Sequence, residues 1–315
     1  MLSTWLTERF RLDVPVVGAP MAGPGEGPLA AAVSAAGGLG MVGVGGQRSA
    51  DWVREQARVA SEPGRAFGIG LMAWVLEQDD APLAAALASG PELVSVSFGD
   101  VDRFVGRVRD AGVAVTTQVG NVDEARRAEA AGVDFLVARG AEAGGHGRND
   151  VATLPLLQAV LENVDLPVVA AGGIATRRGL AAVLAAGAAG AWVGTALLGC
   201  REAGGSAAAR SRLLAASETG TSYGRVFDVA QRLGWPEGYG GRGLRNRYFD
   251  RWADRLDELA TDDAAQQELA DARAAEDYDT AYVYAGEGVG LLDRERTAAE
   301  VLGELARAEE LLRRF

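Results

Sequence analysis

The feature that most constrains the fold of this chain is an eightfold alternation of short apolar runs with alanine-rich stretches. The apolar runs begin at Pro15, Gly38, Ala66, Leu93, Ala114, Phe135, Pro167 and Gly190. Because these runs are continuous, they are typical of strands buried on both faces, whereas a stretch such as DEARRAEAA has the composition of a helix. Eight strand–helix units predict an α/β fold in which a parallel sheet closes into a (β/α)8 TIM barrel.

The amino-acid composition of the chain changes after the eighth apolar run. Aromatic side chains gather at Tyr223, Phe227, Trp235, Tyr239, Tyr248, Phe249 and Trp252, and a charged, helix-like stretch follows them. We therefore expect residues 1–214 and 281–315 to form the barrel, and residues 215–280 to form a helical, aromatic-rich insertion that covers the barrel mouth. The aromatic side chains of this insertion either form a small core or line a pocket.

Composition excludes several classes of protein. With a net charge of −12 over 315 residues, the chain lacks the basic surface of a nucleic-acid-binding protein. It contains no lysine, which excludes Schiff-base chemistry, attachment of pyridoxal phosphate and a P-loop lysine. One cysteine, Cys200, and one histidine, His146, are too few for a zinc site, so we expect no bound metal.

Two segments bear on location in the cell. The N-terminal stretch MLSTWLTERFRLDVP carries charges where a signal peptide needs an apolar core, so we expect a cytoplasmic protein. The uncharged run from Leu180 to Cys200 is long enough to span a membrane. Its alanine and glycine content, with Gly187 inside it, favours a buried helix, a turn and a buried strand instead. We therefore expect no membrane partner.

The second apolar run contains a pattern that resembles a dinucleotide-binding motif. Gly38, Gly40 and Gly43 match G-x-G-x-x-G, which in a nucleotide-binding unit follows a strand and opens a helix. Here the pattern follows the helix-like PLAAAVSAA and enters an apolar run. We interpret it as the end of a helix that leads into a strand.

The seventh and eighth predicted strands carry glycines where TIM barrels commonly bind phosphate. In the motifs AAGGI and VGT, Gly172, Gly173 and Gly194 would let backbone N–H groups approach a ligand, and the hydroxyl of Thr195 could donate to it. The alternative is that these glycines only allow tight turns.

The only histidine, His146, follows the sixth predicted strand in the motif EAGGH. It would therefore lie at the same mouth of the barrel as the candidate phosphate loops. Gly144 and Gly145 leave open space beside it, which suits a flat ligand lying against main chain. A neutral imidazole in this position is a candidate general base, and a core or surface role is the alternative.

Together these motifs resemble those of the nitronate monooxygenase family, formerly called 2-nitropropane dioxygenases, which are FMN-dependent (β/α)8 enzymes. The resemblance covers nearly the whole chain and depends on APMAG, EAGGHGR, PVVAAGGI with the following GLAAVLAAGAAGAWVGT, and AGEGVGLL. It implies that the flavin is contacted by Met21, Ala22, Gly23, Gln118, Arg139, Gly144 and Gly145, with its phosphate on Gly173, Gly194 and Thr195. His146 would be the catalytic base. A single phosphate site without a Rossmann unit favours FMN over FAD.

In that family the base removes the α-proton of a nitroalkane or engages its nitro group, and a nitronate is converted with O2 to a carbonyl compound and nitrite. We expect such a small molecule and O2 as partners, with a homodimer as one option. Two other functions stay open. One is a flavin-dependent enoyl-acyl carrier protein reductase that uses NAD(P)H, because it shares the EAGGH and AAGGI signals. The other is a flavin-binding barrel with little turnover.

Three residues depart from the family pattern. Gly70 stands where the third strand usually has asparagine, Arg139 where the sixth usually has glutamine, and Ala196 where arginine often follows the GT of the eighth. The guanidinium of Arg139 could stabilise negative charge on a reduced flavin, or it could turn outward and form an ion pair. These departures concern the substrate and the strength of catalysis more than flavin binding.

Overall fold

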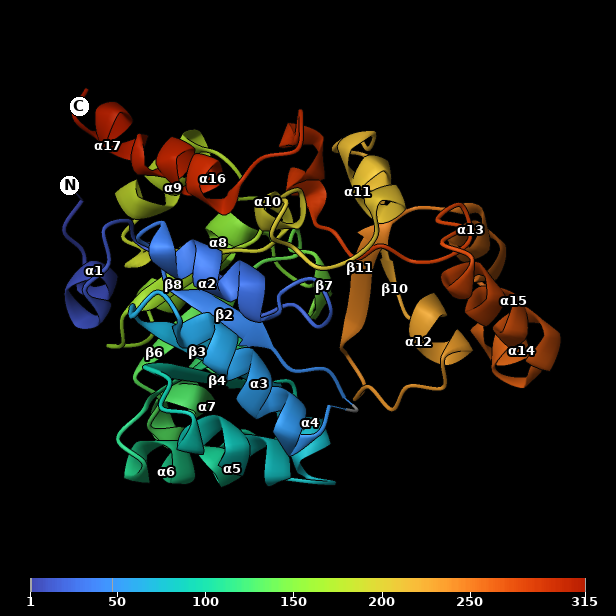
Figure 1. The fold of residues 1–315 in the computed structure, drawn as a ribbon, viewed down its shortest axis with the longest axis horizontal. Coiled ribbons are helices and arrows are strands. Elements are labelled where there is room, and N and C mark those ends of the chain that lie inside the picture. Colours follow the sequence, from blue (N-terminus) through green and yellow to red (C-terminus); the bar gives the residue numbers. More distant parts are fainter. Residues whose placement is uncertain (1, 47, 315) are drawn as a thin grey trace.

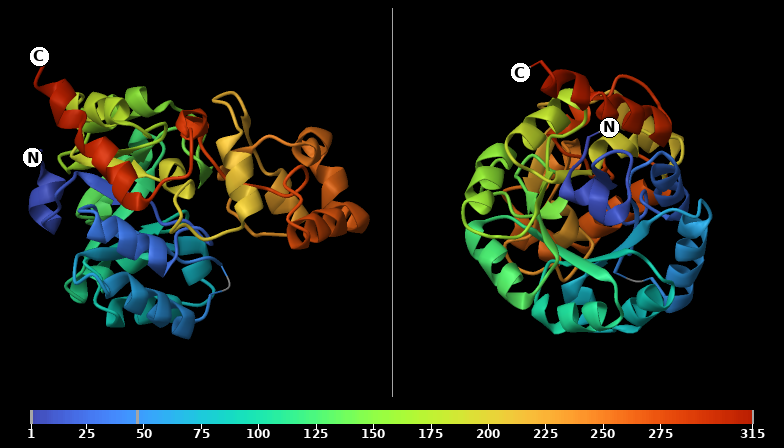
Figure 2. Two further views of the ribbon diagram at one scale, coloured as in Figure 1. Left: turned by 45° about the horizontal axis from the view of Figure 1, so that its top comes forward. Right: turned by 90° about the vertical axis from the view of Figure 1, so that its left-hand side faces the viewer.

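Eight parallel strands form a closed barrel in the computed structural model, which describes residues 2–46 and 48–314 (Figures 1 and 2). The strands are β1 (Val16–Gly18), β2 (Gly40–Gly43), β3 (Phe67–Met72), β4 (Leu93–Ser97), β5 (Ala114–Val119), β6 (Phe135–Arg139), β8 (Val168–Ala171) and β9 (Gly190–Val193). Their order is β1-β9-β8-β6-β5-β4-β3-β2, and a parallel bridge between Val17 and Leu39 closes the circle. The predicted barrel and each of its eight strands are confirmed.

Helices surround the barrel and bury the outer faces of the strands. They are α2 (Gly27–Ala35), α3 (Ala50–Ser61), α5 (Ala81–Ala88), α6 (Asp102–Asp110), α7 (Val122–Ala131), α8 (Thr153–Leu161), α9 (Arg177–Ala185) and α16 (Ala298–Ala306). Helix α16 packs against both α2 and α9. It is therefore the helix of the eighth strand–helix unit, although it follows the strand of that unit, β9, by about a hundred residues. The last helix, α17 (Ala308–Leu312), packs against α9.

The inside of the barrel is a second, smaller core at the N-terminal ends of the strands. Helix α1 (Trp5–Phe10) covers this end, with Leu6 and Phe10 buried beside Phe135 of β6. The Trp5 ring lies 5.5 Å from the Phe135 ring. Because side chains fill this end of the barrel, the space available to a ligand lies at the C-terminal ends of the strands.

Close packing of main chain explains the glycine pattern at β2. An added Cβ at Gly40 would lie 1.9 Å from the carbonyl oxygen of Ala30 in α2, and one at Gly43 would lie 2.4 Å from the nitrogen of Met21. These glycines thus allow the helix and the loop that precedes it to approach the strand, and the pattern leads from a helix into a strand as predicted. The uncharged run after residue 180 contains most of α9, β9 and the short α10 (Thr195–Leu198). Among the described residues, no helix is both long and apolar enough to cross a membrane.

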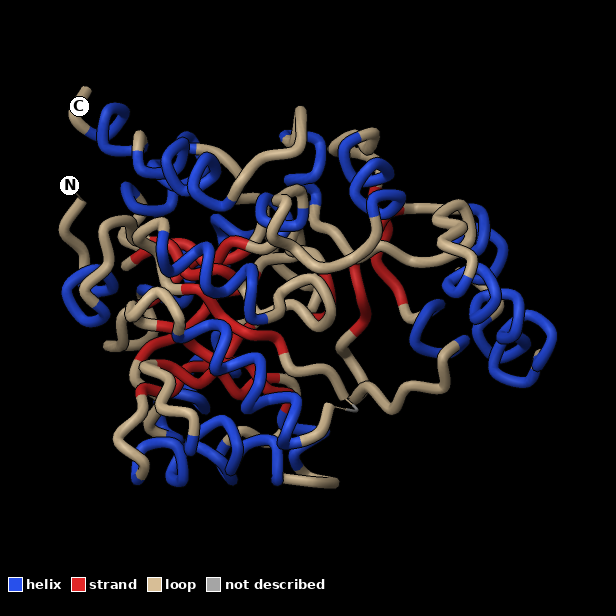
Figure 3. Tube along the Cα trace, viewed as in Figure 1, coloured by secondary structure: helices blue, strands red, loops and turns tan. Residues whose placement is uncertain are grey.

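The insertion forms a separate lobe beside the barrel mouth, on the side away from both termini (Figures 1 and 3). It contains β10 (Thr221–Gly224), α12 (Val226–Ala230), β11 (Gly240–Leu244), α13 (Arg247–Trp252), α14 (Leu256–Thr261) and α15 (Asp263–Ala274). Phe227, Tyr248 and Trp252 belong to a core of its own. The insertion is not purely helical, because β10 and β11 form a three-stranded antiparallel sheet with β7 (Gly145–Gly147). The boundaries at residues 215 and 280 stay predictions.

Candidate active site

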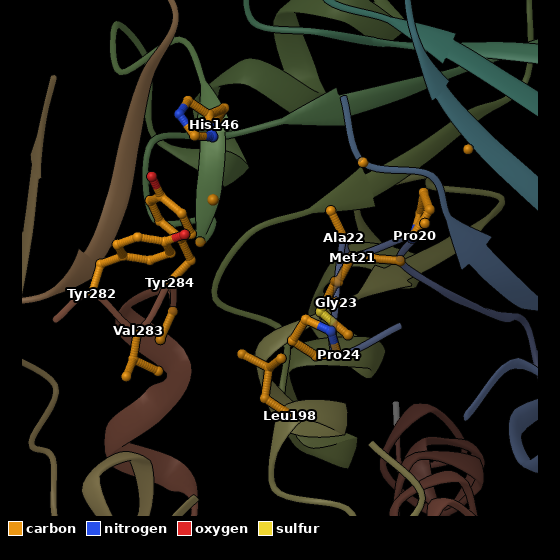
Figure 4. A pocket seen from close by; sticks show the side chains of 18 of the residues that line it. Pro20, Met21, Ala22, Gly23, Pro24, His146, Leu198, Tyr282, Val283 and Tyr284 are labelled. Atoms are coloured by element: carbon orange, nitrogen blue, oxygen red, sulfur yellow. The ribbon is translucent and has the colours of Figure 1, made fainter. Parts of the chain in front are cut away.

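A cavity of about 1390 Å³ lies at the C-terminal ends of the barrel strands, and residues of the insertion form part of its wall. All the predicted site residues line it: Met21, Ala22, Gly23, Gln118, Arg139, Gly144, Gly145, His146, Gly172, Gly173, Gly194 and Thr195. Figure 4 shows His146 with Tyr282 and Tyr284 on one side of the pocket, and Met21, Ala22 and Gly23 across from them. The fold thus brings together segments that are far apart in the sequence.

Several glycines present bare main chain to this cavity. A Cβ added at Gly23 or Gly145 would meet no atom within 4 Å, and one at Gly173 would only approach the Cβ of Glu142, at 3.8 Å. At Gly194 the added carbon would make ordinary contacts of 3.5 Å and longer. The wall around these residues is therefore open to a ligand that packs against backbone, as the phosphate and ring of a flavin do.

Thr195 has a free donor at the same end of the cavity. Its Oγ1 accepts a hydrogen bond from the N–H of Gly286 at 2.9 Å, so the hydroxyl hydrogen remains available. The third strand, in contrast, has no side chain at Gly70 that could reach a ligand. A larger residue would not fit there, since its Cβ would lie 2.3 Å from Cγ of Pro20.

His146 is paired with an acidic residue of the insertion. Its Nε2 lies 2.7 Å from Oδ1 of Asp228 in α12, and the two side chains are only 10% and 1% exposed. Because a carboxylate can only accept, Nε2 is the nitrogen that carries the hydrogen, and in the neutral form of the ring the lone pair belongs to Nδ1. Nδ1 has no hydrogen-bond partner among the described residues. The arrangement can therefore accept a proton at Nδ1 while Asp228 holds the ring.

Two aromatic rings hold the imidazole in place. The ring of Trp235 stacks on His146 at 3.7 Å with an interplanar angle of 4°, and the ring of Tyr284 lies 5.1 Å away. The Tyr284 hydroxyl lies 3.5 Å from Oδ1 of Asp228. Burial and the negative charge of Asp228 raise the pKa of Tyr284 well above its usual value, so this tyrosine stays protonated. The His146 ring and the Tyr284 hydroxyl therefore both meet Oδ1 of Asp228 as donors, while its buried Oδ2 has no hydrogen-bond partner among the described residues.

Arg139 does not turn outward to form an ion pair, which was one of the two arrangements expected from the sequence, and its stabilisation of a reduced flavin stays a prediction. Its side chain is 4% exposed, and its guanidinium donates hydrogen bonds to four backbone carbonyl groups. Burial lowers the pKa of Arg139 to about 10, which still leaves it charged at neutral pH. The guanidinium therefore supports the loop that carries His146 rather than forming an ion pair at the surface.

Asp228, Trp235 and Tyr284 are site residues that the sequence does not single out. Asp228 stands 82 residues after His146 in no recognisable motif, and Trp235 is one of several aromatic residues in the insertion. The aromatic residues of the insertion divide between the two expected roles, since Trp235 lines the cavity and Phe227 lies in the core of the lobe. Cys200 is fully buried, and no cluster of three metal-binding side chains occurs in residues 2–46 and 48–314.

Comparison with known proteins assigns this geometry to a family. The model of the nitronate monooxygenase family matches residues 67–308. The nitronate monooxygenase of Paraburkholderia phytofirmans is 32% identical over 96% of this chain and 95% of its own, and that of Pseudomonas aeruginosa is 32% identical over 97% and 99%. Among solved structures, FabK from Thermotoga maritima matches with a TM-score of 0.87 at 27% identity, covering 100% of this chain and 98% of that one. A nitroalkane oxidase from Streptomyces ansochromogenes matches with a TM-score of 0.81 at 32% identity over 98% and 99%.

Proposed function

Because the chain belongs to the nitronate monooxygenase family, an oxidoreductase family, we propose that it uses FMN to oxidise nitronates or nitroalkanes with O2 to a carbonyl compound and nitrite. The observation that carries this proposal is the pairing of His146, which lines the cavity, with the buried carboxylate of Asp228 behind it. An imidazole whose Nε2–H is held by a buried carboxylate has its Nδ1 lone pair ready for a carbon acid.

In this proposal the side chains of His146 and Asp228 carry out the proton transfer. Nδ1 of His146 removes the α-proton of a neutral nitroalkane, and the electron pair of the broken C–H bond moves onto the nitro group. Asp228 stabilises the imidazolium that results, and Trp235 keeps the ring from turning. A nitronate that is supplied as such has already lost this proton, so it needs His146 only for binding.

Bare main chain and a free hydroxyl support FMN as the cofactor. Gly172, Gly173, Gly194 and Thr195 would hold its phosphate. A carbon added at Gly173 or Gly194 would meet no atom closer than 3.5 Å, so main chain faces the cavity there, and the Thr195 hydroxyl has a hydrogen to donate. The ring would be contacted by Met21, Ala22, Gly23, Gln118, Arg139, Gly144 and Gly145. When bound, FMN supplies the electron acceptor for the organic substrate and the means to activate O2.

The insertion is proposed to close the mouth of the barrel over the substrate. It contributes Trp235 to the wall of the pocket and Asp228 as the partner of His146, so substrate and O2 would react in a space that both lobes enclose. Exclusion of water there would strengthen the attraction between His146 and Asp228. We propose a cytoplasmic enzyme, with a homodimer as the assembly to test.

A flavin-dependent enoyl-acyl carrier protein reductase is the second candidate. The cavity exceeds the ~300–1,000 Å³ that is usual for small-molecule sites, which leaves room for a long acyl substrate. The structural similarity to FabK supports the same alternative. A flavin-binding barrel with little turnover is the third.

A nitrite assay separates these functions. Purified, flavin-loaded protein is mixed under air with ethyl nitronate, and separately with NADH or NADPH in the absence of a nitro compound. Nitrite release from the nitronate with slow bleaching by NAD(P)H is the expected result. Rapid bleaching without nitrite release would favour the reductase, and neither response would favour the protein of low turnover. Mass analysis of the released cofactor tests FMN against FAD.

A further inference from the structure

The charge of Arg139 has no acidic partner close to it. Its Nη2 donates to the carbonyl oxygens of Ala143, Gly144 and Gly145 at 3.1, 3.1 and 3.0 Å, and Nη1 donates to that of Arg148 at 3.2 Å. In the described part of the chain, no carboxylate forms an ion pair with it. The site therefore contains a buried positive charge whose hydrogen-bond partners among the described residues are all neutral carbonyl groups. Such a charge is destabilising unless a negative group compensates it.

These hydrogen bonds determine which way the loop faces. None of the described peptide bonds is cis, so each N–H points opposite to the carbonyl group of the same peptide unit. With the carbonyls of Ala143, Gly144 and Gly145 directed at the guanidinium, the N–H groups of Gly144, Gly145 and His146 point away from it. The Gly144 N–H has no hydrogen-bond partner among the described residues, and both glycines line the cavity. Gly145 can adopt this geometry because it has no side chain at its φ of +70°.

The charges of Asp228, Arg139 and His146 show how the guanidinium would favour formation of an anion beside His146. Before reaction, Asp228 contributes one negative charge, Arg139 one positive charge and neutral His146 none. After His146 takes a proton from a neutral nitroalkane, its positive charge and the negative charge of the nitronate are added, and the total is still zero. Without Arg139, this sum around His146 would be one charge more negative, so the anion would form beside the uncompensated charge of Asp228. Arg273 also lines the cavity, but its guanidinium lies over the ring of Tyr282 rather than on the loop of Gly144 and Gly145. The neighbouring Arg242 does not replace it, because Arg242 is paired with Glu287 at 3.3 Å.

We propose that Arg139 is a positioning residue that turns the N–H groups of Gly144 and Gly145 toward the cavity, and that this surface binds a planar anion beside His146. The natural anion would be the nitronate group, an identity that rests on the function proposed above. Anion binding itself does not depend on that function, since any planar oxyanion of similar size should occupy the same surface.

Nitrate, a planar and unreactive anion, serves as the probe. Its affinity for the flavin-loaded protein is measured by titration calorimetry at constant ionic strength, for the wild type, Arg139→Gln and Arg48→Gln. Arg48 is the matched control, because it also lines the cavity but is 43% exposed and paired with Glu26. We expect Arg139→Gln to weaken nitrate binding at least tenfold and Arg48→Gln to change it less than twofold. Equal affinity in Arg139→Gln and wild type, or an equal loss in both variants, would overturn the proposal.

Steady-state kinetics provide a reading that a purely structural role would not give. In Arg139→Gln, KM for a nitronate should rise about tenfold or more, whereas for a neutral nitroalkane kcat should fall with little change in KM. Loss of structure would instead raise both KM values alike and would lower flavin content. That outcome would count against the proposal.

Two further comparisons keep the test decisive. If Arg139→Gln does not fold, the wild type alone is informative, because nitrate must compete with the nitronate where chloride at the same ionic strength does not. Absence of competition overturns the proposal. If the protein binds nitrate but releases no nitrite from a nitronate, the anion surface stands and the proposed function fails.

Discussion

Replacement of Asp228 by Asn tests whether this carboxylate is part of the proton-transfer machinery. The change keeps the size of the side chain but removes its charge at a position that is 1% exposed and 2.7 Å from Nε2 of His146. The amide can also turn its NH2 group toward Nε2, which would place the ring hydrogen on Nδ1. Either way, the lone pair that is proposed to accept the proton becomes less effective.

The size of the effect follows from the charges. A carboxylate and an imidazolium about 4 Å apart attract by about 4 kcal/mol at the effective dielectric constant of ~20 that suits protein sites. This attraction is absent while His146 is neutral and develops as it takes the proton. If about half of it has developed in the transition state, the barrier rises by about 2 kcal/mol, which is ~30-fold, and the full value corresponds to ~10³-fold. We therefore expect turnover of a neutral nitroalkane to fall by about 30- to 1000-fold.

The assay compares two substrates in one variant. Anaerobic reduction of the flavin is followed by stopped-flow absorbance, with nitroethane and with pre-formed ethyl nitronate. The nitronate should react within about threefold of the wild-type rate, because its proton is already gone. Tyr284→Phe is the control, since it removes only the 3.5 Å contact to Asp228 and should change either rate by less than about threefold. A wild-type rate with nitroethane in Asp228→Asn, or an equal loss with both substrates, would refute the reasoning.

Three further predictions concern other parts of the pocket. Gly194→Ala should fold normally, because its added carbon makes only ordinary contacts, but should retain less flavin in absorbance measurements; full occupancy would exclude a phosphate at this residue. Gly144→Ala should lower the free energy of unfolding in urea by about 1–3 kcal/mol, because its Cβ would lie 2.4 Å from the backbone nitrogen of Gly286. Burial raises the pKa of the Cys200 thiol to about 12, so native protein at pH 8 should react with iodoacetamide far more slowly than urea-unfolded protein, and equal rates would contradict the burial.

The barrel could be predicted from the sequence because its strands are buried on both faces. The runs FGIGLM and LVSVS contain a continuous signal that does not depend on their partners. The sheet of β7, β10 and β11 has no such signal, since the sequences GHG, TSYG and GGRGL are rich in glycine and polar residues. These strands form through long-range pairing, which local patterns do not encode.

The candidate site could be predicted from sequence only where the residue type and its place on a predicted strand together suggest a role. Glycines at strand ends and a single histidine point to the cavity from sequence alone. Asp228 and Arg139 are different, because their roles depend on which partner lies within hydrogen-bond distance. An aspartate in a short helix can have many roles, and only the distance between Asp228 and His146 shows that Asp228 is part of the site. Likewise, the four carbonyl partners of Arg139 depend on the path of a loop that the sequence does not specify.

The pairing of β7 with β11 has a consequence for the newly made chain. His146 lies on β7, opposite Gly241 of β11, and its acidic partner is 82 residues later in the sequence. At a synthesis rate of about 5–20 residues per second, the ribosome needs roughly 4–16 s to reach Asp228 after it has made His146. Six of the eight barrel strands precede His146, and the other two, β8 and β9, are made during that time, while the imidazole still has neither its carboxylate nor its neighbouring strand. A nascent chain that already contains most of the barrel therefore cannot yet carry out the proposed chemistry, and chains that stop before the insertion is complete should be inactive even if they are folded.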